Sequence, residues 1–222
     1  DTDTYDVLVI GGGPAGLSAA LNLGRSLMRV LVVDADRPRN AATLNSHGFL
    51  TRDGVAPHEL RRMARDELAA YPNIEVRTRV RVLELRRSAP PADAGADAGT
   101  GSGTDSGTDA GFTASVGRKD PTDVVTARSV LLATGLRETL PDVPNLRGFY
   151  GISLFSCAAC DAWELRGRRL ALIGETPDLA DRARLISRWT ESLTVFTLGA
   201  DTVTAAEEAE LASTGAVSYT HL

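Results

Sequence analysis

The sequence predicts an α/β fold of two three-layer units, each built on a parallel sheet. Apolar runs of strand length alternate with helical stretches, and the strand–turn–helix–strand pattern of residues 5–34 returns at residues 169–196. The first turn reads Gly11-Gly12-Gly13-Pro14-Ala15-Gly16, which has the spacing of a dinucleotide-binding fingerprint. We therefore expect two Rossmann-like nucleotide-binding domains, residues 1–140 and residues 141–222.

The first domain opens with two buried strands that flank a helix rich in Ala and Leu. The expected elements are a strand at 5–10, a helix at 17–27, strands at 29–34, 74–77, 80–85, 112–116 and 127–135, and a helix at 57–70. Residues 88–111 consist mostly of Ala, Asp, Gly, Thr and Ser. Such a segment buries too little apolar surface to offset its ordering entropy, so we expect a disordered insertion between two strands.

The fingerprint glycines have separate physical roles. Gly11 permits the tight turn, Gly13 lets the backbone approach a pyrophosphate, and Gly16 allows close packing of helix on strand. The helix that follows offers amide donors at its N-terminus. Asp34 ends the second strand, where its carboxylate can accept hydrogen bonds from ribose hydroxyls. This pattern alone leaves FAD and NAD open.

The second domain follows a proline-marked linker at residues 141–145. We expect a strand at 169–173, a turn at 174–177, a helix at 178–189 and a strand at 193–196. Residues 217–222 match nothing that precedes them, and we expect them to be foreign to the fold.

The two cysteines of the chain stand at Cys157 and Cys160, and Asp161 follows them. Two thiols at this spacing can open and close a disulfide, and the first is typically held at a lowered pKa. Asp161 could move a proton beside them or cap a turn. The three histidines show no ligand spacing to the cysteines, so we predict no zinc or other metal site.

Composition excludes several classes of partner. The net charge is −5 and no region gathers Lys and Arg on an expected surface, which argues against nucleic acid and anionic membranes. No apolar stretch is long enough to span a bilayer. Closely spaced thiols suit a redox role in a reducing compartment, and we expect a cytoplasmic protein.

The residues from Asp6 to about Gly215 resemble the low-molecular-weight thioredoxin reductases, which are FAD-dependent disulfide oxidoreductases. The resemblance rests on the fingerprint, on Ala133-Thr134-Gly135 and on the cysteine motif with Asp161. It implies that the fingerprint, with Pro14 and Ala15, and Asp34 hold FAD, beside Ala133, Thr134 and Gly135. It also implies that Cys160 faces the flavin, Cys157 attacks a partner disulfide and Asp161 donates a proton.

Two departures from the family pattern make NADPH doubtful. The turn expected to hold the nicotinamide cofactor reads Gly174-Glu175-Thr176-Pro177-Asp178-Leu179-Ala180, with side chains and acidic charge where backbone should approach phosphate. Residues 197–200 read Thr-Leu-Gly-Ala and lack the cations expected to hold a 2′-phosphate.

Residues 39–54 differ from the Gly-Gly-Gln segment of the family and resemble a subgroup, the NADPH-independent dithiol oxidases. His47 in this segment is either a packed or surface histidine or an acid/base beside the flavin. The C-terminal flavin-binding segment of the family is missing, so we expect a C-terminally truncated first domain.

Three functions remain open. The first is an FAD-dependent, thioredoxin-reductase-like exchange of electrons between flavin, the cysteine pair and a substrate. The substrate would be a thioredoxin-like protein or a small-molecule dithiol or disulfide. The second is a dithiol oxidase with dioxygen as electron acceptor. The third is a non-catalytic nucleotide-binding fragment. The resemblance also implies a homodimer.

Overall fold

A computed structural model describes residues 3–88, 111–199, 202–213 and 215–219. The chain divides into two compact units, residues 1–41 with 58–137 and residues 42–57 with 138–222. The domain boundaries that we expect at residues 140 and 141 stay a prediction. Apart from residues 88 and 111, the expected disordered insertion lies outside the described residues.

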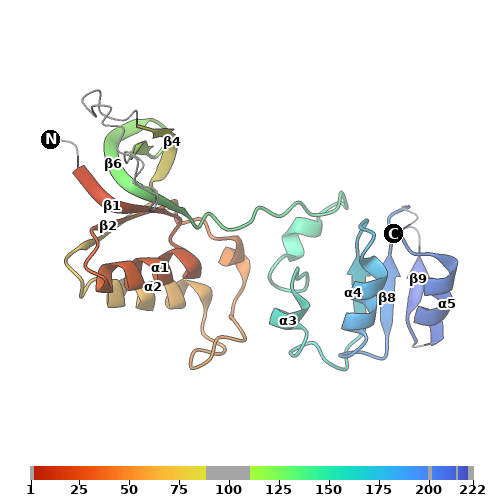
Figure 1. Cartoon of the computed structure of the whole chain (residues 1–222). Helices are drawn as coiled ribbons and strands as arrows, with labels where there is room; N and C mark the ends of the chain where they lie inside the picture. The colour runs from red at the N-terminus through yellow and green to blue at the C-terminus, as the bar shows by residue number, and fades with distance from the viewer. Residues whose placement is uncertain (1–2, 89–110, 200–201, 214, 220–222) are drawn as a thin grey trace, which may run out of the picture. The chain divides into compact units, whose positions relative to one another are not determined.

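The first unit contains a six-stranded sheet and two α-helices (Figure 1). Its elements are β1 (Asp3–Ile10), α1 (Pro14–Arg25), β2 (Val30–Asp34), the 3-10 helix η1 (Arg39–Ala42), α2 (Pro57–Leu68), β3 (Ile74–Thr78), β4 (Arg81–Arg87), β5 (Phe112–Gly117) and β6 (Pro121–Leu132). The strand order is β3-β2-β1-β6-β5-β4. The first four strands in this order run parallel, and β5 pairs antiparallel with both β6 and β4. This arrangement confirms the predicted α/β class.

Both faces of this sheet are buried, which explains the continuous apolar runs in its central strands. In β2, Val30 and Val32 pack on the face that carries Leu17 of α1, whereas Leu31 and Val33 pack on the opposite face. Helices α1 and α2 lie on the same side of the sheet in Figure 1. The four β2 side chains are at most 2% exposed.

Several elements of the first unit differ in extent from the sequence-based expectation, and β6 and α1 differ most at their starts. Strand β6 starts at Pro121 rather than at residue 127, because its first half pairs antiparallel with β5 across a tight connection. Helix α1 starts at Pro14, whose fixed φ and missing N–H suit the first helical position.

Strands β4 and β5 are paired with each other. The backbone N–H of Ser88, just after β4, donates to the carbonyl oxygen of Gly111, just before β5, at 2.7 Å.

The second unit contains a three-stranded parallel sheet in the order β7-β8-β9. Its elements are η2 (Leu146–Phe149), α3 (Ala158–Asp161), β7 (Leu170–Ile173), α4 (Leu179–Ile186), β8 (Leu193–Phe196), α5 (Ala205–Ser213) and β9 (Val217–Tyr219). Buried side chains of α4, β8 and α5 form its core, among them Leu179, Val195 and Leu211.

The expectation that residues 217–222 are foreign to the fold is wrong for the first three of them. Val217 to Tyr219 form β9, in register with Thr194 to Phe196 of β8. Ala216, 2% exposed, packs in the core just before this strand. A three-residue strand carries too little pattern to be recognised without its pairing partner. No helix in the described part of the chain is long and apolar enough to cross a membrane.

The core position of Leu31 generates a stability prediction. Leu31 is fully buried in the first unit, so Leu31→Ala should lower the free energy of unfolding by about 2–5 kcal/mol. Leu27→Ala is the matched control, because Leu27 is 89% exposed and its loss should cost less than about 0.5 kcal/mol. Denaturant unfolding followed by circular dichroism measures both values. Equal losses would contradict the packing described for β2.

Candidate functional site

Backbone approaches backbone closely at the glycine turn that joins β1 to α1. Gly11 has φ +113°, and a Cβ there would lie 2.2 Å from the carbonyl oxygen of Ala133. A Cβ at Gly16 would lie 1.9 Å from the carbonyl oxygen of Gly11. Ala133 N also donates to Ile10 O at 2.9 Å. The turn, the start of α1 and the segment after β6 therefore meet at one edge of the sheet.

Gly13 differs from these two glycines, because nothing lies within 4 Å of a Cβ built on it. Gly13 is the N-cap residue of α1, and no side chain caps the helix there. The Asp34 carboxylate at the end of β2 lies beside the turn, 2.7 Å from a Cβ built on Gly12. Free amide donors, open space and a carboxylate at the strand end fit the pyrophosphate and ribose of a dinucleotide.

The structure thus brings together Gly11, Gly13, Gly16, Asp34 and Ala133, all of which the sequence singled out. Thr134 is also close, its Cα lying 3.3 Å from a Cβ built on Gly11. Pro14 and Ala15 form the first turn of α1. Gly135 has φ +70°, with open space around a Cβ built on it. The binding roles of these residues stay a prediction.

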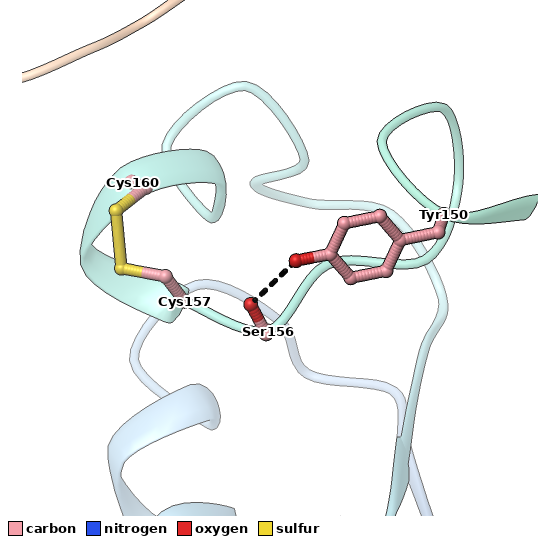
Figure 2. Close-up of a disulfide and its surroundings, with 4 residues drawn as sticks. All are labelled: Tyr150, Ser156, Cys157 and Cys160. Atoms are coloured by element: carbon pink, nitrogen blue, oxygen red, sulfur yellow. Dashed lines mark hydrogen bonds between the residues drawn. A yellow bond between two sulfur atoms is a disulfide. The ribbon is translucent and has the colours of Figure 1, made fainter. Parts of the chain in front are cut away.

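Cys157 and Cys160 form a disulfide in the second unit (Figure 2). Their Cα atoms lie 5.3 Å apart, and Cys160 N donates to Cys157 O at 3.2 Å. Cys157 is the N-cap residue of α3 and Cys160 lies within this helix. Both residues are half-buried. The helical turn sets the spacing of the two sulfur atoms, so the disulfide can form within one local element.

Side chains hold the segment that precedes the disulfide. The Tyr150 hydroxyl donates its hydrogen to the Glu138 carboxylate. At 3.2 Å it also accepts a hydrogen bond from the Ser156 hydroxyl (Figure 2). Ser156 directly precedes Cys157. Tyr150 N also donates to Arg147 O at 3.2 Å. These bonds limit the freedom of the chain on the N-terminal side of the redox pair.

Asp161 is the last residue of α3 and follows Cys160 directly. Burial raises the pKa of the Asp161 carboxyl above its usual range; positive charge on a protonated His47 opposes this shift, and the Glu164 carboxylate adds to it. A carboxyl with a raised pKa holds its proton to higher pH. Asp161 is therefore suited to donate a proton beside the cysteine pair.

The turn between β7 and α4 is filled by its own side chains. The Asp178 carboxylate accepts from the Thr176 hydroxyl at 2.5 Å and from Arg182 Nε at 2.7 Å. Leu179 is 1% exposed, and its Cδ1 lies 2.8 Å from a Cβ built on Gly174. A carboxylate at the start of α4 repels a phosphate at the position where a dinucleotide fold would bind one.

Sequence reasoning missed the polar residues that surround the disulfide. Glu138, Tyr150 and Ser156 lie on irregular segments, where no periodicity marks them. Asp53 and Glu164 are brought together by His47, whose Nδ1 lies 3.6 Å and 3.7 Å from their carboxylate oxygens. The Asp53-Gly54 pair is a turn signal that could have indicated a hairpin returning toward His47.

The family described as pyridine nucleotide-disulphide oxidoreductase matches residues 5–175. A curated relative, the thioredoxin reductase tcpT of Claviceps purpurea, is 32% identical over 177 residues, or 79% of this chain and 48% of the relative. The chain spans about half the length of the curated relatives it matches.

Solved structures show the same similarity. The crystal structure of TrxB from Bacillus anthracis is 34% identical with a TM-score of 0.82, over 97% of this chain and 64% of that one. The crystal structure of an oxidoreductase from Agrobacterium tumefaciens is 33% identical with a TM-score of 0.82, over 98% and 65% of the two chains.

The contrast between two glycines generates a prediction about the turn. Gly16→Ala places a methyl group against the Gly11 carbonyl and should cost about 1–3 kcal/mol of free energy of unfolding. Gly13→Ala has room for its methyl group and should cost less than about 1 kcal/mol as an N-cap change, yet it fills the space that the cofactor needs and should weaken dinucleotide binding at least tenfold. Thermal unfolding and flavin fluorescence titration measure the two effects. Unchanged flavin affinity in Gly13→Ala would contradict the prediction that the dinucleotide binds at the glycine turn.

Proposed function

The chain belongs to the pyridine nucleotide-disulphide oxidoreductase family, and from this premise we propose that it exchanges electrons between FAD, the Cys157–Cys160 disulfide and a disulfide or dithiol substrate. The observation that carries the proposal is the redox pair within one helical turn, followed by Asp161 with its raised pKa. FAD, when bound, would accept or supply the electron pair. The residues that would hold FAD are Gly11, Gly13, Pro14, Ala15, Gly16, Asp34, Ala133, Thr134 and Gly135.

The chemistry of the pair is thiol–disulfide exchange. In the reducing direction the Cys157 thiolate attacks a substrate disulfide, forms a mixed disulfide and releases the first substrate thiolate. The Cys160 thiolate then displaces the second substrate thiolate and closes the Cys157–Cys160 disulfide. The substrate gains two electrons, the cysteine pair loses two, and Asp161 supplies a proton to a departing thiolate. The oxidising direction is the reverse of these steps.

The partner that we propose is a thioredoxin-like protein or a small-molecule disulfide or dithiol. Its sulfur atoms must reach two half-buried cysteines on a short helix. We also propose a cytoplasmic location, because a reducing compartment keeps such a pair in redox exchange. A homodimer is proposed by analogy with the thioredoxin reductases.

A second candidate function is a dithiol oxidase that does not use NADPH. The turn between β7 and α4 favours it, since the Asp178 carboxylate lies at the N-terminus of α4, where a dinucleotide fold would bind phosphate. In this function a substrate dithiol reduces the Cys157–Cys160 disulfide and leaves as a disulfide. The two electrons and two protons then pass to dioxygen and give hydrogen peroxide.

Single serine variants test the division of work between the cysteines. Cys160→Ser cannot resolve the mixed disulfide and should accumulate an adduct at Cys157 with oxidised glutathione as probe. Cys157→Ser removes the attacking thiol and should give at least tenfold less adduct, while turnover of the FAD-loaded protein is lost in both. Mass spectrometry under non-reducing conditions measures the adducts. A larger adduct yield in Cys157→Ser than in Cys160→Ser would reverse the assigned roles.

The electron donor is tested by the flavin absorbance of the FAD-loaded protein under anaerobic conditions. If the second candidate holds, NADPH should leave the flavin oxidised, because the Asp178 carboxylate repels its phosphates, whereas dithiothreitol should bleach it. Cys157→Ser should lose bleaching by the dithiol and thus control for direct reduction. Rapid bleaching by NADPH would instead support a nicotinamide-dependent reductase.

A further inference from the structure

A short hairpin in the second unit presents His47 to the segment that follows the disulfide. Ser46 N donates to Val55 O at 2.9 Å and Gly54 N donates to Ser46 O at 2.8 Å, which closes the hairpin of residues 46–55. Inside it, Gly48 N donates to Asp53 Oδ1 at 2.8 Å. The side chain of His47 is 21% exposed. These hydrogen bonds hold the backbone on both sides of His47.

His47 bridges two segments that are far apart in the sequence. Its Nδ1 lies 3.6 Å from Asp53 Oδ1 in its own hairpin and 3.7 Å from Glu164 Oε1, four residues beyond Cys160. Both segments belong to the same compact unit. Gly151, which lies before the disulfide, also approaches Ala42, since a Cβ on Gly151 would be 2.6 Å from the Ala42 carbonyl group. The segment 42–57 thus contacts the chain on both sides of the redox pair.

The groups that face His47 are acidic from both segments. Asp53 comes from the hairpin, and Asp161 and Glu164 come from the segment around the disulfide. The backbone N–H of Gly48 and the His47 side chain lower the pKa of Asp53, so this carboxyl is charged at neutral pH. Asp161 adjoins Cys160 and Glu164 follows four residues after it, so negative charge on either carboxyl group opposes the formation of a thiolate.

We propose that His47 is a positioning residue for the redox pair: its imidazole joins the 46–55 hairpin to Glu164 and, when protonated, balances the charge of that carboxylate. The inference rests on the proposed disulfide chemistry of Cys157 and Cys160. Reduction of their disulfide takes two electrons and two protons and gives two thiols, and one of these must lose its proton to attack a substrate. A protonated His47 makes that loss of a proton less costly, because its positive charge offsets the charge of Glu164 and Asp53.

The test measures the reactivity of the reduced cysteines in the full chain, with neither FAD nor substrate. The rate of alkylation by iodoacetamide is followed by mass spectrometry from pH 5.5 to 9, after the reductant has been removed. Removal of one nearby charge shifts a pKa by about one unit, so His47→Asn should slow alkylation about tenfold at pH 6.5 and move the pH profile upward. His58→Asn, an exposed histidine on α2, is the matched control and should leave the profile unchanged.

A second variant keeps the test decisive if His47→Asn does not fold. Glu164→Gln leaves the imidazole in place and removes one negative charge, so it should speed alkylation at pH 6.5 about threefold. In the double variant it should recover part of the rate lost in His47→Asn. An unchanged pH profile in a folded His47→Asn protein, or slower alkylation in Glu164→Gln, would overturn the proposal.

These outcomes separate this inference from the proposed function. Alkylation reports thiolate formation alone, whereas the serine variants and the flavin spectra report electron transfer. A normal serine-variant result with an unshifted His47→Asn profile would reject only the role of His47. A shifted profile together with turnover that survives Cys157→Ser would reject only the proposed function.

Discussion

Contact of backbone with backbone at the carboxyl edge of β1 constrains the rest of the first unit. Because the carbonyl oxygens of Gly11 and Ala133 stand where side chains would otherwise project, α1 packs tightly on the sheet and β6 ends beside the turn. That packing places the N-terminus of α1 next to the open space beside Gly13, where the Asp34 carboxylate also lies close. The shape of the site thus depends on the fold, and above all on the glycines, which allow the backbone to approach closely or leave open space.

In the second unit, the cysteine pair and Asp161 lie on or next to the short helix α3. The disulfide is contained in one helical turn, and the geometry around it comes from side chains on irregular segments, including Tyr150 on one side and Glu164 on the other. Short segments of this kind gain little stability from periodic packing, so their hydrogen bonds and ion pairs carry more of the positioning. The hairpin of residues 46–55, which precedes most of the first unit in sequence, belongs to the second unit, where His47 lies 3.7 Å from Glu164.

The sequence was sufficient where a pattern repeats or a residue type is rare. The apolar strands, the glycine turn and the cysteine pair were all predictable, because burial on both faces, close backbone approach and thiol exchange each permit few residue types. Strand β9 was not predictable, since three residues hold no periodicity and only pairing with β8 defines them. The environment of Asp161 was not predictable either, because His47 lies more than a hundred residues earlier and its approach depends on tertiary packing.

The number of residues in the connection between β4 and β5 has little effect on the geometry of the glycine turn, because the two strands are joined by hydrogen bonds of their own. The two strands are hydrogen-bonded to each other, and the bond between Ser88 and Gly111 joins the chain ends from which residues 89–110 depart. The entropy of closing a loop grows only with the logarithm of its length, so a doubling costs about 0.6 kcal/mol. A change in the number of residues between Ser88 and Gly111 should therefore leave the glycine turn at the carboxyl end of β1 unchanged, because β6 separates β1 from β5.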